Sequence, residues 1–236
     1  MKQHELWLIW RSMGKDGNRR RYRVGTLTWD EEKDFYTFKY DHDHDFDIAK
    51  EAGFAFFPGF DEDKEYTSEK MFSNIFSRLP KPERDDYLDV LNRYGLNIDD
   101  DLFKVLTVTK GRQVTDNFEF VPEFNSEKIE FDVAGIDHRE EIEIRECVED
   151  GYLVDGAKLL LELDSENQYD EFAIKVLLPL RDKKILLGYV PRYYSKELTD
   201  ILRTGIKYSA VVARVNFNAQ ISDEKVTVRI RLMIEQ

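Results

Sequence analysis

The hydrophobic positions near the N-terminus of the chain follow the pattern of β-strands. Segments rich in aromatic and branched residues alternate with polar turns, and they predict strands at residues 5–11, 22–29 and 35–40. Turn signals at residues 14–18 and 30–34 separate these segments. We therefore expect an antiparallel meander at the start of the chain.

A helical pattern follows the meander. Apolar residues between Met71 and Leu79 recur at helical spacing and predict a helix that ends before Pro80. Pro82 and Gly95 are typical of the first turn and the C-terminal end of a second helix. The first half of the chain thus combines a small sheet with helices.

A polar segment at residues 122–128 interrupts this pattern, and we predict one domain at residues 1–124 and another at residues 129–236. Beyond it, strand patterns dominate and one helix is expected at residues 195–203. The strand-like segments are residues 131–136, 142–146, 158–163, 173–178, 185–190, 208–217 and 226–235. Short strands with one helix fit a small, partly open barrel such as the OB-fold. The predicted fold class is α+β, with a small N-terminal antiparallel sheet with helices and a C-terminal OB-like β-barrel with one helix.

The charge of the chain restricts the partners that it can bind. It carries 35 Lys and Arg against 48 Asp and Glu, a net charge of −13. Proteins that bind duplexes without sequence preference usually present a basic face, so any nucleic-acid contact must be local and small. An acidic surface also suits a basic protein partner.

The sequence lacks the motifs of common enzymes. It contains no Walker-type phosphate loop, kinase catalytic loop, G-x-S-x-G elbow or H-E-x-x-H pair. Cys147 is the single cysteine, which excludes internal disulfides and a cysteine metal cluster, and its neighbours do not suggest a nucleophile. We predict a non-enzymatic protein without a cofactor.

Neither a membrane segment nor a signal peptide is apparent. The chain has no run of 18 or more apolar residues, and its N-terminus leads directly into a strand-like segment. A chain with one cysteine cannot form an internal disulfide, so a reducing compartment is the simplest location for it. We expect a cytoplasmic protein with no membrane partner.

Two charged segments permit more than one interpretation. Residues 41–47 alternate Asp and His, but an extended chain would direct only His42 and His44 to one side, so we predict an acidic surface loop and no metal site. The basic run at residues 19–23 could contact nucleic acid or an acidic peptide, or it could be a solvated strand edge.

The second half of the chain contains four short motifs whose order and spacing match those of a known family. They are VAG at residues 133–135, NQYD at 167–170, AIKV at 173–176 and GYVPR at 188–192. Together they resemble the HIRAN domain, over roughly residues 131–235. The resemblance implies an OB-like barrel, which in helicase-associated DNA-repair enzymes grips the 3′ end of single-stranded DNA.

The residues of these motifs can form such a site. Tyr169 can stack on a terminal base, Asp170 can accept a hydrogen bond from a 3′-hydroxyl and repel a terminal phosphate, and Arg192 can neutralise a backbone phosphate. The predicted DNA-binding set is His138, Asn167, Tyr169, Asp170, Tyr189, Arg192 and Phe217. Alternatively, Tyr169 and Asp170 simply shape the turn. The chain departs from DNA-binding relatives at His138, where they carry an aromatic pair, and at Gln168, where they usually carry proline.

The first half has a separate resemblance. Residues 24–27 and 35–40, FFPGF at 56–60, RLP at 78–80 and residues 111–122 resemble the small N-terminal subdomain of HipA-type kinases and its free-standing version, HipS. The kinase body itself is missing. The resemblance implies a subunit that packs on a separate toxin kinase and neutralises it, and we predict a partner-binding face around Phe56, Phe57 and Phe60.

Two functions follow from the two resemblances. The first is an antitoxin-like subunit that binds and restrains a separate HipA-type serine/threonine kinase, with a HIRAN domain that senses DNA or anchors the complex. The alternative is a module that binds the 3′ end of single-stranded DNA in repair or phage defence. A scaffold without DNA contact is a third and weaker interpretation.

Overall fold

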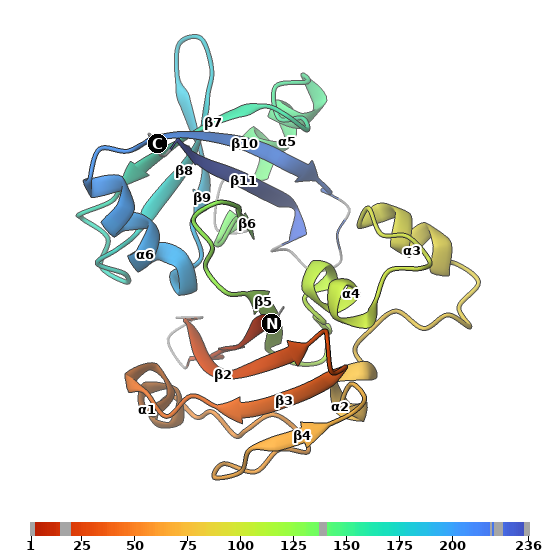
Figure 1. The fold of residues 1–236 in the computed structure, drawn as a ribbon. Coiled ribbons are helices and arrows are strands. Elements are labelled where there is room, and N and C mark those ends of the chain that lie inside the picture. Colours follow the sequence, from red (N-terminus) through yellow and green to blue (C-terminus); the bar gives the residue numbers. More distant parts are fainter. Residues whose placement is uncertain (1–2, 15–19, 137–140, 218, 220–223, 234–236) are drawn as a thin grey trace. The chain divides into compact units, whose positions relative to one another are not determined.

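The chain divides into two compact units, Met1–Glu123 and Phe124–Gln236. A computed structural model describes residues 3–14, 20–136, 141–217, 219 and 224–233 (Figure 1).

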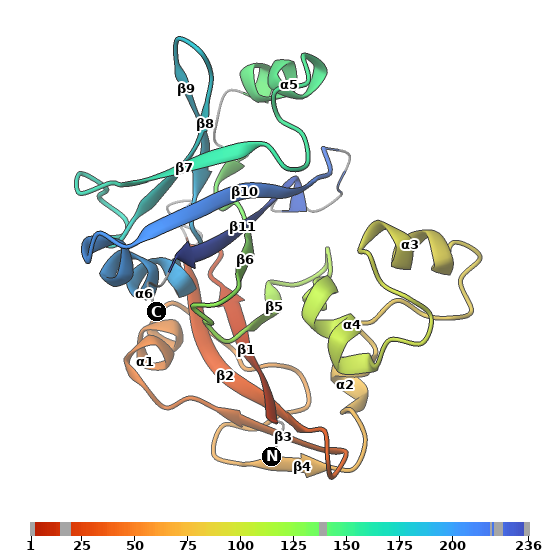
Figure 2. The ribbon, with the colours of Figure 1, turned by 45° about the horizontal axis from the view of Figure 1, so that its top comes forward.

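An antiparallel sheet forms the framework of the N-terminal unit. Its strands are β1 (Gln3–Arg11), β2 (Arg21–Asp30), β3 (Phe35–Tyr40), β4 (Tyr66–Ser68) and β5 (Phe118–Pro122). They lie in the order β4-β3-β2-β1-β5, and Figure 2 shows β2 between β1 and β3. The β1–β2–β3 register, with Leu6 opposite Leu27 and Leu27 opposite Phe38, confirms the predicted meander.

Four helices belong to this unit, and the two predicted from residues 71–79 and 82–95 are shorter than expected. The four helices are α1 (His44–Glu51), α2 (Ser73–Phe76), α3 (Tyr87–Arg93) and α4 (Leu102–Thr109). The predicted acidic loop at residues 41–47 is wrong, because α1 begins within it. The Asp43 carboxylate caps this helix by accepting a hydrogen bond of 3.0 Å from the backbone N–H of Phe46, and Phe46 and Ala49 face the core.

Aromatic side chains fill the core of the N-terminal unit. The rings of Phe38 and Phe60 stack at 4.1 Å, and the Tyr40 hydroxyl accepts a hydrogen bond of 2.9 Å from the backbone N–H of Phe57. Phe57 and Phe60 are only 1% and 5% exposed. The predicted partner-binding face is therefore wrong for Phe57 and Phe60, which the unit needs for its own core, whereas Phe56 is half-buried.

A curled antiparallel sheet forms the C-terminal unit. Its strands are β6 (Ile129–Asp132), β7 (Lys158–Leu163), β8 (Ile174–Pro179), β9 (Lys184–Tyr189), β10 (Lys207–Val215) and β11 (Val226–Met233). They lie in the order β6-β11-β10-β7-β8-β9. The helix α6 (Arg192–Arg203) corresponds to the predicted helix and begins three residues earlier.

The two edges of this sheet, at β6 and β9, approach each other. The backbone N–H and carbonyl groups of Ala134 and Tyr189 exchange two hydrogen bonds of 2.9 Å each, which join the chain after β6 to the end of β9. Gly188 permits this approach, because a Cβ there would lie 2.4 Å from the carbonyl oxygen of Ala134. The sheet thus curls into the OB-like barrel that the sequence predicts.

One predicted strand of the C-terminal unit is a helix. Residues 142–146 lie within α5 (Glu141–Glu149). The alternation of Ile142 and Ile144 suits a strand, but the helix buries Ile144 and Cys147, which are nearly one turn apart, and leaves Ile142 75% exposed. The segment therefore forms a helix, in which Ile144 and Cys147 lie on the same buried face.

Candidate nucleic-acid interface

A polar loop between β7 and β8 carries the residues that the NQYD motif contributes. The Asn167 side-chain oxygen accepts hydrogen bonds from the backbone N–H groups of Tyr169, at 2.9 Å, and of Asp170, at 3.1 Å. The backbone N–H of Asp164 donates to the carbonyl of Ala173 at 2.8 Å, which closes the base of the loop. Asn167 therefore acts as an Asx-turn residue that holds Tyr169 and Asp170 in place.

Tyr169 and Asp170 have different surroundings within this loop. The Tyr169 side chain is 66% exposed. Asp170 is half-buried; its Oδ1 accepts from the backbone N–H of Phe172 at 3.0 Å, and its Oδ2 accepts from the Ser195 hydroxyl at 2.8 Å. Because each carboxylate oxygen has two lone pairs, each can accept a further hydrogen bond beyond these.

A second carboxylate lies at the base of the loop. Asp164 is buried; one of its oxygens is 3.0 Å from the Lys175 ammonium, and the other accepts from the Tyr189 hydroxyl at 3.0 Å. Burial acts to raise the pKa of Asp164, but the hydrogen bonds from Lys175, Tyr189 and Asn167 outweigh it and lower that pKa below its ordinary value. Asp164 is therefore ionised and anchors Tyr189 from β9 and Lys175 from β8.

The Asp164 carboxylate should make the acid stability of this unit depend on pH in a defined way. Its pKa in the folded chain lies below the ordinary value of 3.8, so it stabilises the fold above that pH and ceases to do so as the pH falls through the lowered pKa. We expect Asp164→Asn to be less stable at neutral pH and to lose less further stability below about pH 4 than the wild type.

Thermal denaturation followed by circular dichroism, in steps from neutral pH to about pH 3, measures this dependence. Asp182→Asn, which removes an exposed aspartate in the turn between β8 and β9, is the matched control and should keep the wild-type pH dependence. An Asp164→Asn profile parallel to that of the wild type would refute the assigned role.

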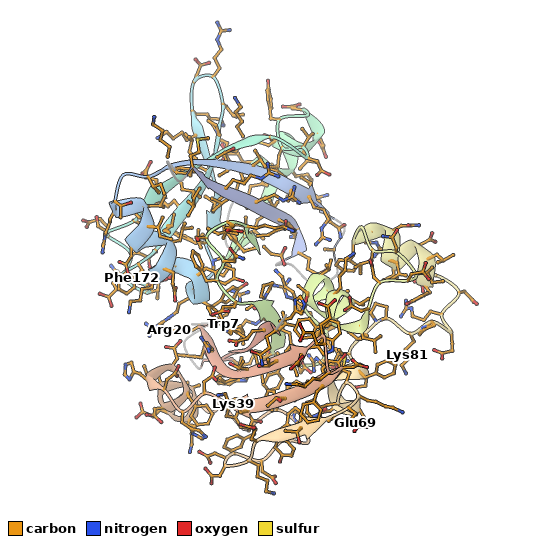
Figure 3. The ribbon with its side chains drawn as sticks, in the orientation of Figure 1. Trp7, Arg20, Lys39, Glu69, Lys81 and Phe172 are labelled. Atoms are coloured by element: carbon orange, nitrogen blue, oxygen red, sulfur yellow. The ribbon has the colours of Figure 1, made fainter. Side chains whose placement is uncertain are left out.

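Helix α6 packs against the same loop and begins with a cation. Arg192 is the first residue of the helix and is half-buried, and Pro191 precedes it. The Thr199 hydroxyl donates to the carbonyl of Phe172 at 2.9 Å. Phe172, labelled in Figure 3, lies beside α6, and the Lys196 ammonium is 6.0 Å from its ring. The helix thus brings the arginine of the GYVPR motif to the loop of the NQYD motif.

The sequence of the C-terminal unit matches a known family. The family model of the HIRAN domain matches residues 126–233. This segment is a HIRAN domain. The predicted resemblance of residues 131–235 is thereby confirmed, whereas the family match leaves residues 1–125 uncovered. The resemblance of the first half to HipA-type kinases stays a prediction.

Two crystal structures are similar to the chain at low identity. A protein from Lactobacillus plantarum is 23% identical with a TM-score of 0.33, and the match covers 43% of this chain and 91% of that chain. The HIRAN domain of human HLTF is 17% identical with a TM-score of 0.32, and the match covers 44% of this chain and 74% of that chain. A comparison with curated protein sequences finds no match.

Hydrogen bonds join most of the predicted site residues of the HIRAN domain. Asn167, Tyr169 and Asp170 share one loop, and Tyr189 joins it through Asp164, which also accepts from the Asn167 amide at 3.4 Å. The backbone carbonyl of Arg192 joins it through Ser195. Ser195, Asp164 and Lys175 complete this network, although none of them belongs to the predicted DNA-binding set. The strand register explains the place of Lys175 in the network, because Lys175 lies opposite Glu162 on β7 and opposite Tyr189 on β9.

One described residue of the predicted DNA-binding set lies apart from this network. Phe217 follows β10, is half-buried, and has the Lys225 ammonium 5.8 Å from its ring centroid. The hydrogen bonds described above do not connect it to the loop, so its stacking role stays a prediction. His138 lies outside the described residues.

The other charged segments take part in local structure. From the basic run, Arg21 forms an ion pair with Glu119 at 3.1 Å and Arg23 forms one with Asp41 at 2.7 Å. In the part of the chain that the structure describes, no group of three or more His, Cys, Asp or Glu residues is placed to hold a metal ion. The helices within those residues include none that is long and apolar enough to cross a membrane.

Proposed function

We propose that the HIRAN domain binds the 3′-hydroxyl end of single-stranded DNA. The observation that carries this proposal is the pairing of an exposed tyrosine with a restrained carboxylate on one loop. Tyr169 is 66% exposed, and the neighbouring Asp170 carboxylate is held by two hydrogen bonds but keeps lone pairs for a further donor.

The chemistry of a 3′ end suits both groups. A terminal base has an open face on which an exposed aromatic ring can stack, whereas an internal base is covered by its neighbours. The terminal 3′-hydroxyl is a hydrogen-bond donor, and a bond to a carboxylate is stronger than a bond between neutral groups. A terminal 3′-phosphate would instead meet the Asp170 charge and be repelled.

The charge of the chain agrees with end binding rather than binding along the length of a strand. A protein with a net charge of −13 gains little from neutralising many phosphates in succession. Binding of one terminal nucleotide needs only a local cation. Arg192 begins α6, and Ser195 of the same helix contacts both the Arg192 backbone carbonyl and the Asp170 carboxylate of the loop. We therefore propose a contact limited to the last nucleotides of the strand.

A competition experiment tests whether a strand end is what the protein recognises. A fluorescent single-stranded oligonucleotide is bound to the full chain, and unlabelled competitors of the same length and sequence are added. We expect a linear single strand to displace the probe and a circular single strand to displace it far more weakly. Equal competition by the circle would refute end binding, because a circle offers the same bases and phosphates without an end.

Arg192 should contribute a smaller and salt-dependent part of the affinity. We expect Arg192→Gln to weaken binding of a 3′-hydroxyl oligonucleotide by about 3- to 10-fold at low salt, and by less as salt rises, because one phosphate contact is lost. Binding isotherms at several salt concentrations measure this. Arg203→Gln, at the far end of α6 and with an exposed side chain, is the matched control and should bind as the wild type does.

The comparisons with known proteins give no support for the kinase partner predicted for the N-terminal unit. Phe57 and Phe60 are buried in the core of that unit, which removes them from any partner surface. Restraint of a separate HipA-type kinase by residues 1–124 thus stays a prediction from sequence resemblance, and we assign no described surface to it.

A further inference from the structure

Two hydroxyl side chains on α6 connect this helix to the DNA-binding loop. Ser195 and Thr199 are each 1% exposed and lie about one helical turn apart. Thr199 donates to the backbone carbonyl of Phe172 at 2.9 Å, whereas Ser195 donates to the side chain of Asp170 at 2.8 Å. The first bond fixes the path of the loop, and the second fixes the group proposed to recognise the DNA end.

The Ser195 hydroxyl has two acceptors within reach but only one proton to donate. Besides Asp170 Oδ2 at 2.8 Å, the backbone carbonyl of Arg192 lies 3.0 Å from Ser195 Oγ. The Asp170 oxygen is the closer acceptor, and a hydrogen bond to a carboxylate is stronger than one to a backbone carbonyl, so the proton is directed to Asp170. The alternative bond to Arg192 stays available whenever the carboxylate charge is removed.

The hydrogen bond from Ser195 limits the rotation of the Asp170 carboxylate. One oxygen is held by the backbone N–H of Phe172 and the other by Ser195, so the plane of the carboxylate is fixed at both ends. With Ser195 removed, a single bond would remain and the half-buried group could rotate about it. A freely rotating Asp170 carboxylate would bind a 3′-hydroxyl more weakly, because its oxygens would no longer be aligned with the donor. It would also repel a 3′-phosphate less, because its charge could move away from the phosphate.

We propose that Ser195 is a positioning residue for 3′-end recognition, acting through Asp170. This inference rests on the proposed function of the loop. Ser195 acts without contacting the DNA, because it sets the orientation in which Asp170 accepts the 3′-hydroxyl. Its removal should therefore reduce the discrimination between 3′-hydroxyl and 3′-phosphate ends more than it reduces the stability of the protein.

The test measures one ratio, the dissociation constant for a 3′-phosphate oligonucleotide divided by that for the matching 3′-hydroxyl oligonucleotide. It is determined for the full-length wild type, Ser195→Ala, Asp170→Asn and the double variant. Thr199→Val is the matched control, because it removes a buried hydroxyl bonded to the same loop without touching Asp170. Melting temperatures of all five proteins are recorded alongside.

We expect Ser195→Ala to lower the ratio by about 5- to 10-fold, comparable to the net contribution of one typical hydrogen bond, and Thr199→Val to leave it within about twofold of the wild type. In the Asp170→Asn background, Ser195→Ala should have no further effect, because its influence passes through the carboxylate.

Each remaining outcome has a definite meaning. A wild-type ratio near one would refute the proposed function, and the inference with it. A high wild-type ratio that Ser195→Ala leaves unchanged would refute the inference alone. Equal losses in Ser195→Ala and Thr199→Val would also refute it, since they would assign both hydroxyls a purely structural role.

Discussion

Replacing Asp170 with asparagine is expected to abolish the preference of the protein for 3′-hydroxyl ends. The amide keeps an oxygen that can accept from the Phe172 N–H, and Ser195 can turn to the carbonyl of Arg192, so the loop should keep its fold. The bond to a charged acceptor is lost, which should weaken binding of a 3′-hydroxyl strand by about 10-fold or more. Binding of a 3′-phosphate strand should become tighter, because the repulsion is gone.

The neighbouring residue provides a control for net charge. Glu171 is exposed, and Glu171→Gln changes the charge of the protein by the same amount as Asp170→Asn. We expect Glu171→Gln to keep the wild-type preference when both variants are compared by fluorescence anisotropy. If both substitutions changed binding equally, a general charge effect would replace the assigned role of Asp170.

Removing the Tyr169 ring is expected to weaken binding to either kind of end. Stacking of one base on an aromatic side chain contributes about 1–3 kcal/mol, so Tyr169→Ala should reduce affinity by about 5- to 150-fold. Stacking does not distinguish a hydroxyl from a phosphate, and the ratio of the two affinities should therefore change little. The melting temperature should stay close to that of the wild type, because the side chain is 66% exposed.

Tyr152 offers a matched comparison in the same unit. It is also an exposed tyrosine, with 55% of its surface accessible, and it is not part of the loop network. We expect Tyr152→Ala to bind oligonucleotides as the wild type does. A Tyr169→Ala protein that retained full affinity would show that this ring merely covers the turn.

Local sequence patterns predicted the framework of both sheets. The meander of β1, β2 and β3 follows from alternating apolar residues with clear turns between them. The same logic failed where alternation and helical spacing coincide, as in α5, where Ile144 and Cys147 determine the buried face. It also missed the start of α1, although Asp43 followed by the apolar pair Phe46 and Ala49 is a recognisable capping signal.

Prediction of the site had a similar limit. The residues Asn167, Tyr169 and Asp170 could be found because they lie within one four-residue motif. Asp164, Lys175 and Ser195 come from three different elements, and their contacts depend on strand register and helix packing. Burial of Phe57 and Phe60 was equally inaccessible, because a run of aromatic residues is compatible with either a core or an interface.

The most direct test of end recognition is the affinity of the full-length wild type for two single strands that differ only at their 3′ terminus. Fluorescence anisotropy at one fixed salt concentration, with a 5′ label on both strands, gives the two dissociation constants. The arrangement of Tyr169, Asp170 and Arg192 predicts that the 3′-hydroxyl strand binds about tenfold tighter or more than the 3′-phosphate strand. Equal affinities, or tighter binding of the phosphate, would contradict it.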